Sequence, residues 1–118
     1  SPNFIALHEM FDKFNEQAEE HVDDLAERIV QLGGHAHGTL ASVAKTSPLP
    51  AYPAGFNKAA DHLDALAEHT AFLGSLVRKG IAVSADAGDA NTADLLTAVS
   101  RDLDKRLWFI EAHLQDKG

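Results

Sequence analysis

Apolar side chains recur at alternating steps of three and four residues along three long stretches of this chain. This spacing places one apolar stripe along a helix, since consecutive helical residues turn by about 100°. No stretch shows the two-residue alternation of a strand, so the pattern predicts an all-α fold of long antiparallel helices. The apolar positions are Phe4, Leu7, Phe11, Phe14, Ala18, Val22, Leu25, Ile29 and Leu32; then Phe56, Ala59, Leu63, Leu66, Thr70, Leu73, Val77 and Ile81; then Leu96, Val99, Leu103, Leu107, Ile110 and Leu114.

Glycine, proline and capping residues predict the first helix boundaries. The first long helix ends at Gly33-Gly34, because glycine readily adopts the left-handed conformation that ends a helix. A short helix runs from a cap at Thr39 to Ala44, and the proline-rich residues 47–53 end it.

The two later helices have weaker boundary signals. We expect the second long helix to begin near Ala54 and to fade in residues 84–90, and the third to begin at a cap on Asn91 or Thr92. Three long helices and a short one make an incomplete bundle. A fourth long helix, from before Ser1 or from another chain, would complete it.

Charge and composition narrow the classes of function. The 118 residues fit one domain, 1–118, and no apolar run approaches the roughly 20 residues of a membrane-spanning helix. The absence of cysteine excludes disulfides and thiolate metal sites. A net charge of −8 without a basic tail repels nucleic acid and suits a protein that attracts cations.

Four polar residues on the first helix form a candidate metal site. With His8 at zero, Asp12, Asp23 and Glu27 lie near about 40°, 60° and 100° around the axis, at the border of the apolar stripe. Each i, i+4 pair can share one cation, and one imidazole with carboxylates suits Fe(II), Mn(II) or Zn(II). Ordinary surface charge on an acid-rich helix is the alternative interpretation of this spacing.

The two pairs are too far apart to meet within one helix. His8 and Asp23 are separated by roughly 22 Å along the axis. However, the midpoint of His8 and Glu27 coincides with that of Asp12 and Asp23, near Ala18. An antiparallel second copy about a two-fold axis there would bring His8 and Asp12 of one chain to Asp23 and Glu27 of the other.

Several separate motifs resemble the Dps family of ferritin-like proteins, and the similarity covers essentially the whole chain. The motifs are Asn3-Phe-Ile-Ala-Leu-His-Glu-Met-Phe-Asp12, Asp23-Asp-Leu-Ala-Glu-Arg28, Leu32-Gly-Gly, Asp89-Ala-Asn-Thr-Ala-Asp94 and Ser100-Arg-Asp-Leu-Asp-Lys-Arg-Leu-Trp-Phe109.

The resemblance implies a ferritin-like four-helix bundle with a short helix in the middle connection. It implies two-fold dimers that assemble into a dodecameric cage in the cytoplasm, which can be associated with the nucleoid. Such cages act as ferroxidases: they oxidise Fe(II) with hydrogen peroxide or dioxygen and store ferric iron, which limits oxidative damage to DNA. Iron is thus the implied metal.

The resemblance also assigns roles to residues. His8 and Asp12 match ligands from one subunit, Glu27 matches the partner's carboxylate, and Asp23 is its companion. Asp94 matches an acidic residue of the family's three-fold pores, and Asp86 and Asp89 lie just upstream. Asp94 at a helix N-terminus is equally explained by the helix dipole.

The sequence departs from the family pattern at its start. A further ligand histidine belongs on a helix before His8, and that helix precedes Ser1. We expect the native protein to contain it.

Two other classes of function remain open. One is a DNA-compacting protein, against which the negative charge argues; the other is a helical oligomer with incomplete metal sites.

Further histidines carry weak signals: His35 and His37 lie in a loop, and His62 and His69 are too far apart on one helix to share an ion.

Overall fold

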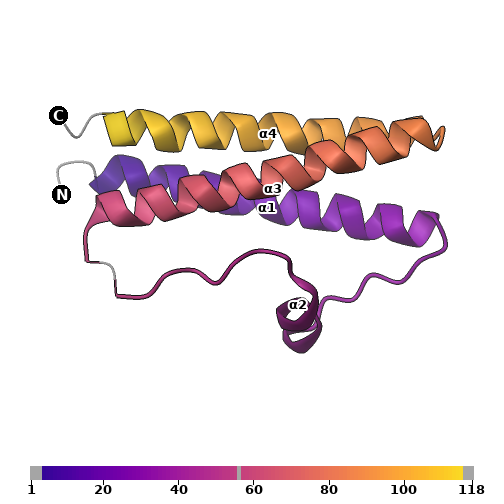
Figure 1. Cartoon of the computed structure of the whole chain (residues 1–118), viewed down its shortest axis with the longest axis horizontal. Helices are drawn as coiled ribbons and strands as arrows, with labels where there is room; N and C mark the ends of the chain where they lie inside the picture. The colour runs from indigo at the N-terminus through magenta and orange to yellow at the C-terminus, as the bar shows by residue number, and fades with distance from the viewer. Residues whose placement is uncertain (1–3, 56, 116–118) are drawn as a thin grey trace. The chain divides into compact units, whose positions relative to one another are not determined.

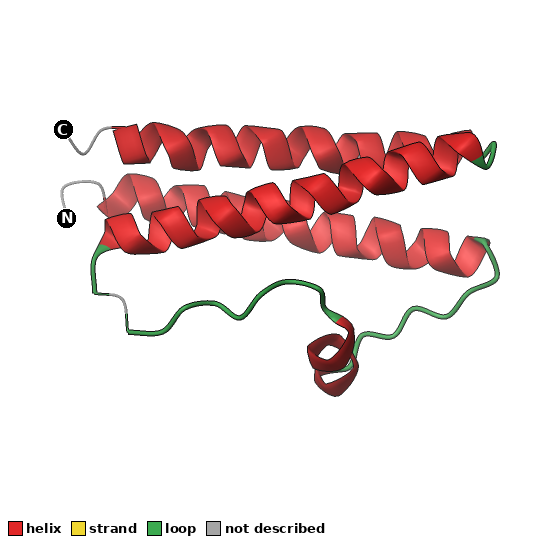
Figure 2. Ribbon diagram, in the orientation of Figure 1, coloured by secondary structure: helices red, strands yellow, loops and turns green. Residues whose placement is uncertain are grey.

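The computed structural model describes residues 4–55 and 57–115, and every regular element in these ranges is a helix (Figure 2). Their order is α1 (Phe4–Gln31), α2 (Leu40–Thr46), α3 (Ala59–Asp86) and α4 (Ala90–Gln115). Two compact units divide the chain: Ser1–Gly38, which contains α1, and Thr39–Gly118, which contains α2, α3 and α4. The all-α fold class is confirmed.

Helix α1 ends as its glycine pair predicts. Gly33 adopts a φ of 88°, a conformation that disfavours side chains with a Cβ. The Gly33 N–H donates to the Val30 carbonyl at 3.0 Å, and the Gly34 N–H donates to the Ile29 carbonyl at 2.8 Å. These two bonds form a Schellman motif, which satisfies carbonyls at the helix end.

Helix α2 is a short helix in the connection between α1 and α3, and its predicted cap is confirmed. The Ser42 N–H donates to Thr39 Oγ1 at 3.2 Å. Ser47 has an extended backbone, so the helix ends at Thr46, two residues beyond the predicted Ala44.

Helices α3 and α4 pack side by side as an antiparallel hairpin (Figure 1). A short turn joins them, in which Gly88 has a φ of 78° and its N–H donates to the Ala85 carbonyl at 3.0 Å. Such a short connection forces neighbouring helices to run in opposite directions. The buried residues of the two helices are Leu63, Ala65 and Gly74 from α3 and Val99, Ser100, Leu103 and Ile110 from α4.

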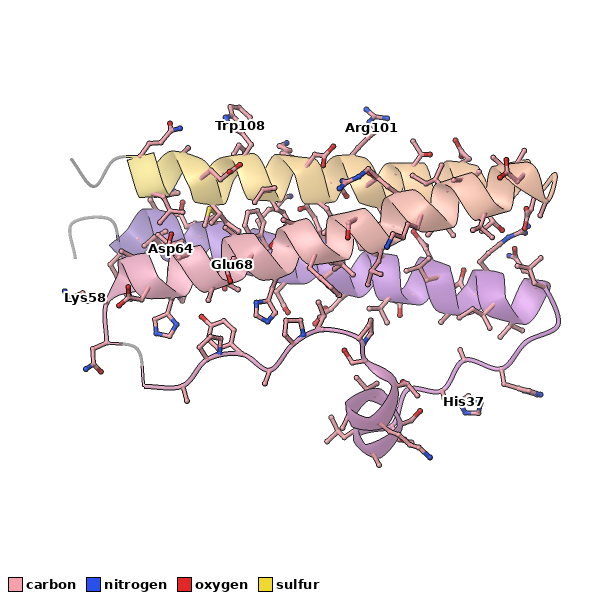
Figure 3. All side chains as sticks on the ribbon, viewed as in Figure 1. His37, Lys58, Asp64, Glu68, Arg101 and Trp108 are labelled. Atoms are coloured by element: carbon pink, nitrogen blue, oxygen red, sulfur yellow. The ribbon has the colours of Figure 1, made fainter. Side chains whose placement is uncertain are left out.

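Small residues set how closely the two helices approach. A Cβ added at Gly80 of α3 would lie 3.0 Å from Leu96 Cδ1, so glycine makes room for a leucine of α4 there. On the other side of α4, Arg101 and Trp108 project away from α3 (Figure 3), and Trp108 is 64% exposed.

Two predicted helix starts are wrong. Helix α3 begins at Ala59 rather than near Ala54, because Gly55 has a φ of 85° and Lys58 has an extended backbone. Helix α4 begins at Ala90, so Asn91 and Thr92 lie inside it and neither is its cap. Phe56, assigned to the apolar face of α3, lies outside the described residues.

Among the described helices, none combines the length and apolarity needed to cross a membrane. The expectation of a single domain over residues 1–118 stays a prediction.

Candidate metal site on the first helix

The i, i+4 spacing brings His8 and Asp12 together on one face of α1. His8 Nε2 lies 3.4 Å from Asp12 Oδ2, and their side chains are 63% and 68% exposed. The Phe4 ring stacks on the His8 imidazole at a centroid distance of 5.8 Å. Since Phe4 is one turn earlier, this contact covers one face of the ring and leaves its edge directed at Asp12. An imidazole nitrogen and a carboxylate oxygen are thus presented together to solvent.

The second predicted pair, Asp23 and Glu27, lies on the same helix and is also exposed. Glu27 borders a groove of 480 Å³ whose other lining residues are Ala26, Val30, Gln31 and Ala36. Most of these residues are apolar or small, so this carboxylate stands at the edge of a largely apolar surface.

A single chain does not bring the two pairs together. The helical rise separates His8 from Asp23 by roughly 22 Å. Within residues 4–55 and 57–115, no three histidine, aspartate or glutamate side chains are close enough to hold one metal ion. Each pair supplies only two ligand groups, so a metal site here would need further ligands from outside the described residues of one chain.

The three acidic residues assigned to an entry pore surround the turn between α3 and α4. Asp86 is the last residue of α3, and Asp94 is exposed in the second turn of α4. Asp89 caps α4: Thr92 N–H donates to Asp89 Oδ1 at 3.1 Å, and the Thr92 hydroxyl donates to Asp89 Oδ2 at 2.5 Å. Asp89 is therefore the cap of α4, the role that was predicted for Asn91 or Thr92.

A cluster of Tyr52, His62 and His69 links the chain before α3 to α3 itself. The Tyr52 hydroxyl and His62 Nδ1 are hydrogen-bonded at 2.7 Å, and their rings stack. His69 bonds the carbonyls of Ala65 and Pro50. The spacing of His62 and His69 predicts that they share no ion, but it does not predict these contacts, because no spacing rule pairs His69 with a residue 19 positions earlier.

The chain is similar to ferritin-like proteins over nearly its whole length. The family model described as a ferritin-like domain matches residues 1–117. The DNA protection during starvation protein of Agrobacterium fabrum is 53% identical over 117 residues, which are 99% of this chain and 72% of that protein. That of Brevibacillus brevis is 34% identical over 97% of this chain and 76% of its own length.

Solved structures give the same result. An N-terminal deletion mutant of Dps from Mycobacterium smegmatis has a TM-score of 0.92 and 35% identity, over 100% of this chain and 78% of that one. Dps from Staphylococcus aureus has a TM-score of 0.89 and 28% identity, over 97% of this chain and 76% of that one. The chain therefore belongs to the Dps family of ferritin-like proteins.

Proposed function

We propose that this protein stores iron and, as a ferroxidase, oxidises Fe(II) at sites shared between subunits. The observation that carries the proposal is the exposed pair of His8 Nε2 and Asp12 Oδ2, 3.4 Å apart, in a member of the Dps family. One imidazole with carboxylates is a donor set that suits Fe(II). Carboxylates favour Fe(III) over Fe(II), so such a site eases oxidation of the bound ion.

A second copy of the chain completes each site in this proposal. When two α1 helices run antiparallel about an axis near Ala18, His8 and Asp12 of one chain lie opposite Asp23 and Glu27 of the other. The symmetry of such a dimer generates two equivalent sites. The groove beside Glu27 supports this arrangement, because a partner helix would remove its apolar lining from water. Six such dimers would form a dodecameric cage.

The reaction balances with two Fe(II) ions for each hydrogen peroxide. Each Fe(II) gives up one electron, the O–O bond of the peroxide breaks, and with two protons the two oxygens leave as water. The ferric product then hydrolyses and is stored as mineral inside the cage. Fe(II) and peroxide are consumed together, which limits the hydroxyl radicals that would damage DNA.

Acidic residues at the turn between α3 and α4 fit an entry route for Fe(II). A ring of carboxylates concentrates cations at a pore by its field. Asp86 and Asp94 are exposed and available for this role. Asp89 contributes charge, although both of its oxygens are bonded to Thr92.

A nucleoid-compacting role is the second candidate, and the names of the relatives favour it only through the words "DNA protection". The net charge of −8 opposes it. The basic pair Lys105-Arg106 offers little, because Arg106 is partly buried. Burial lowers the pKa of its guanidinium, against the opposing effect of Asp102.

Fe(II) loading followed by peroxide tests the ferroxidase proposal. Under anaerobic conditions Fe(II) is added to the assembled protein, peroxide is then mixed in, and ferric absorbance is followed. The variant His8→Ala/Asp12→Ala should lose the fast phase. Asp12→Ala/Asp23→Ala removes two negative charges and should lose it as well, because each shared site then lacks two carboxylates.

The matched control is Glu20→Ala/Asp24→Ala on the same helix. It also removes two negative charges in i, i+4 spacing, but at about 120° and 160° around the axis, beyond the edge of the candidate stripe that Glu27 marks at about 100°. This variant should keep the fast phase. Equal rates in all three variants and the unaltered protein would reject the site.

A further inference from the structure

The His69 imidazole is held between two backbone carbonyls. Its Nδ1 lies 2.8 Å from the Ala65 oxygen, and its Nε2 lies 2.9 Å from the Pro50 oxygen. Carbonyl oxygens only accept hydrogen bonds, so both ring nitrogens must donate for both contacts to be bonds. Only the protonated imidazolium carries a proton on each nitrogen. The geometry therefore selects the charged form of His69.

The surroundings of the ring favour the same form. The bond to the Pro50 carbonyl is the largest cause that raises the pKa of His69 above its ordinary 6.5, followed by the bond to Ala65, while partial desolvation opposes them. Among the described residues, the charged group acting on the ring is Glu68, which also raises the pKa. The Tyr52 ring, from the preceding segment, lies beside the His69 ring at a centroid distance of 5.8 Å, and its hydroxyl is hydrogen-bonded to His62.

The segment that His69 holds connects α2 to α3. Within the unit Thr39–Gly118, the helices that pack together are α3 and α4, so α2 is joined to them through residues 47–58. Pro48, Pro50 and Pro53 make the first half of this segment stiff and remove three backbone donors. The contacts that hold it to α3 include those of His69 and Tyr52.

We propose that His69 is a proton-operated clamp: when protonated it fixes residues 47–53, the segment that follows α2, on α3, and when neutral it releases one of its two carbonyls. A neutral imidazole has one N–H, so one nitrogen then presents a lone pair to a carbonyl oxygen and the contact is lost. The clamp is closed at pH values below 6.5, the ordinary histidine pKa, and it loosens as the pH rises through the raised pKa of His69.

Carbonyl NMR tests the clamp directly. The sequence contains two Pro-Ala steps, Pro50-Ala51 and Pro53-Ala54. Protein labelled with carbonyl-¹³C proline and ¹⁵N alanine therefore gives two signals in a carbonyl–amide correlation, one for each proline carbonyl. The His69 ring shifts are recorded in the same pH series with ring-labelled histidine.

We expect His69 to titrate with a midpoint above 6.5 and the Pro50 carbonyl shift to follow that midpoint. The Pro53 carbonyl is the internal control and should not follow it. In His69→Gln the Pro50 inflection should disappear. Tyr52→Phe removes the bond to His62 but keeps the aromatic ring, so the inflection should remain.

Two results would overturn the clamp. One is a His69 midpoint at or below 6.5 in the unaltered protein, which decides the question even if His69→Gln does not fold. The other is a Pro50 carbonyl shift that is flat across the His69 titration, or that persists in His69→Gln.

Discussion

Truncating Leu103 tests whether the buried contacts between α3 and α4 are the main source of the stability of this hairpin. Leu103 is only 5% exposed on α4. Its change to alanine removes three buried carbon groups, each worth about 0.8 kcal/mol, which amounts to about 2.4 kcal/mol of transfer free energy. The cavity left behind adds to this, so we expect the free energy of unfolding to fall by about 3 kcal/mol.

Leu40 provides a matched control, because Leu40→Ala makes the same chemical change at a side chain that is 90% exposed. It should change the free energy of unfolding by less than about 0.5 kcal/mol. Urea unfolding followed by circular dichroism at equal protein concentration measures both variants. Circular dichroism reports on all helices, whereas Trp108 is largely exposed and would report weakly. If Leu103→Ala lowers the free energy of unfolding no more than Leu40→Ala does, the buried contacts between α3 and α4 do not hold the hairpin as described.

Three further predictions concern single residues. Asp89→Ala should lower the free energy of unfolding in urea by about 1 kcal/mol, because α4 loses its cap. Asp94 is exposed in the second turn, so Asp94→Ala should lower it by less than about 0.5 kcal/mol. Equal losses in the two variants would contradict the capping role of Asp89. Gly33→Ala should cost about 1 kcal/mol through its φ of 88° alone, since a Cβ there meets nothing within 4 Å. Gly38→Ala, equally open but without a positive φ, should be neutral or slightly stabilising, and a similar loss at both positions would refute the conformational cause. The stability that His69 contributes should be complete below pH 6.5, the ordinary histidine pKa, and should be lost as pH rises through the raised value. Thermal unfolding of His69→Gln should therefore converge with that of the unaltered protein at alkaline pH, and a gap that stays constant with pH would argue against it.

The helices themselves could be predicted from the sequence because their signals are local. The spacing of apolar side chains predicted the length of α1, and Gly33-Gly34 predicted its end to within one residue. Thr39 is the predicted cap of α2 and bonds Ser42 as expected. Each of these features depends on residues within a turn or two of one another, which is the range over which a sequence pattern is informative.

The two wrong helix starts have different physical causes. Helix α3 starts at Ala59 without a side-chain cap at Lys58, so its first residue had no local signal to mark it. For helix α4, Asn91 and Thr92 were the predicted caps, and both lie one turn or less from the residue that caps the helix, Asp89. Asp89 takes the role because it follows Gly88, whose left-handed conformation ends α3 and reverses the chain at that point.

Candidate ligands could be predicted only as pairs. The i, i+4 rule brings His8 to Asp12, and their 3.4 Å contact confirms that these two side chains meet. The assignment of His8, Asp12, Asp23 and Glu27 to one site stays a prediction, because it depends on a second chain. The contact of His69 with Pro50 could not be predicted, since it depends on how a proline-rich segment runs over α3.

Assembly and iron chemistry are coupled in the proposed function because both depend on α1. Large apolar side chains of this helix are open in the single chain, with Phe4 61% and Val22 64% exposed. Covering such residues favours association, and the proposed antiparallel partner that covers them also carries the missing carboxylates. A rigid rod keeps its two ligand pairs about 22 Å apart whatever its side chains do. Within that proposal no rearrangement of one chain can form the site, so the dimer, and not the subunit, is the smallest unit that can oxidise iron.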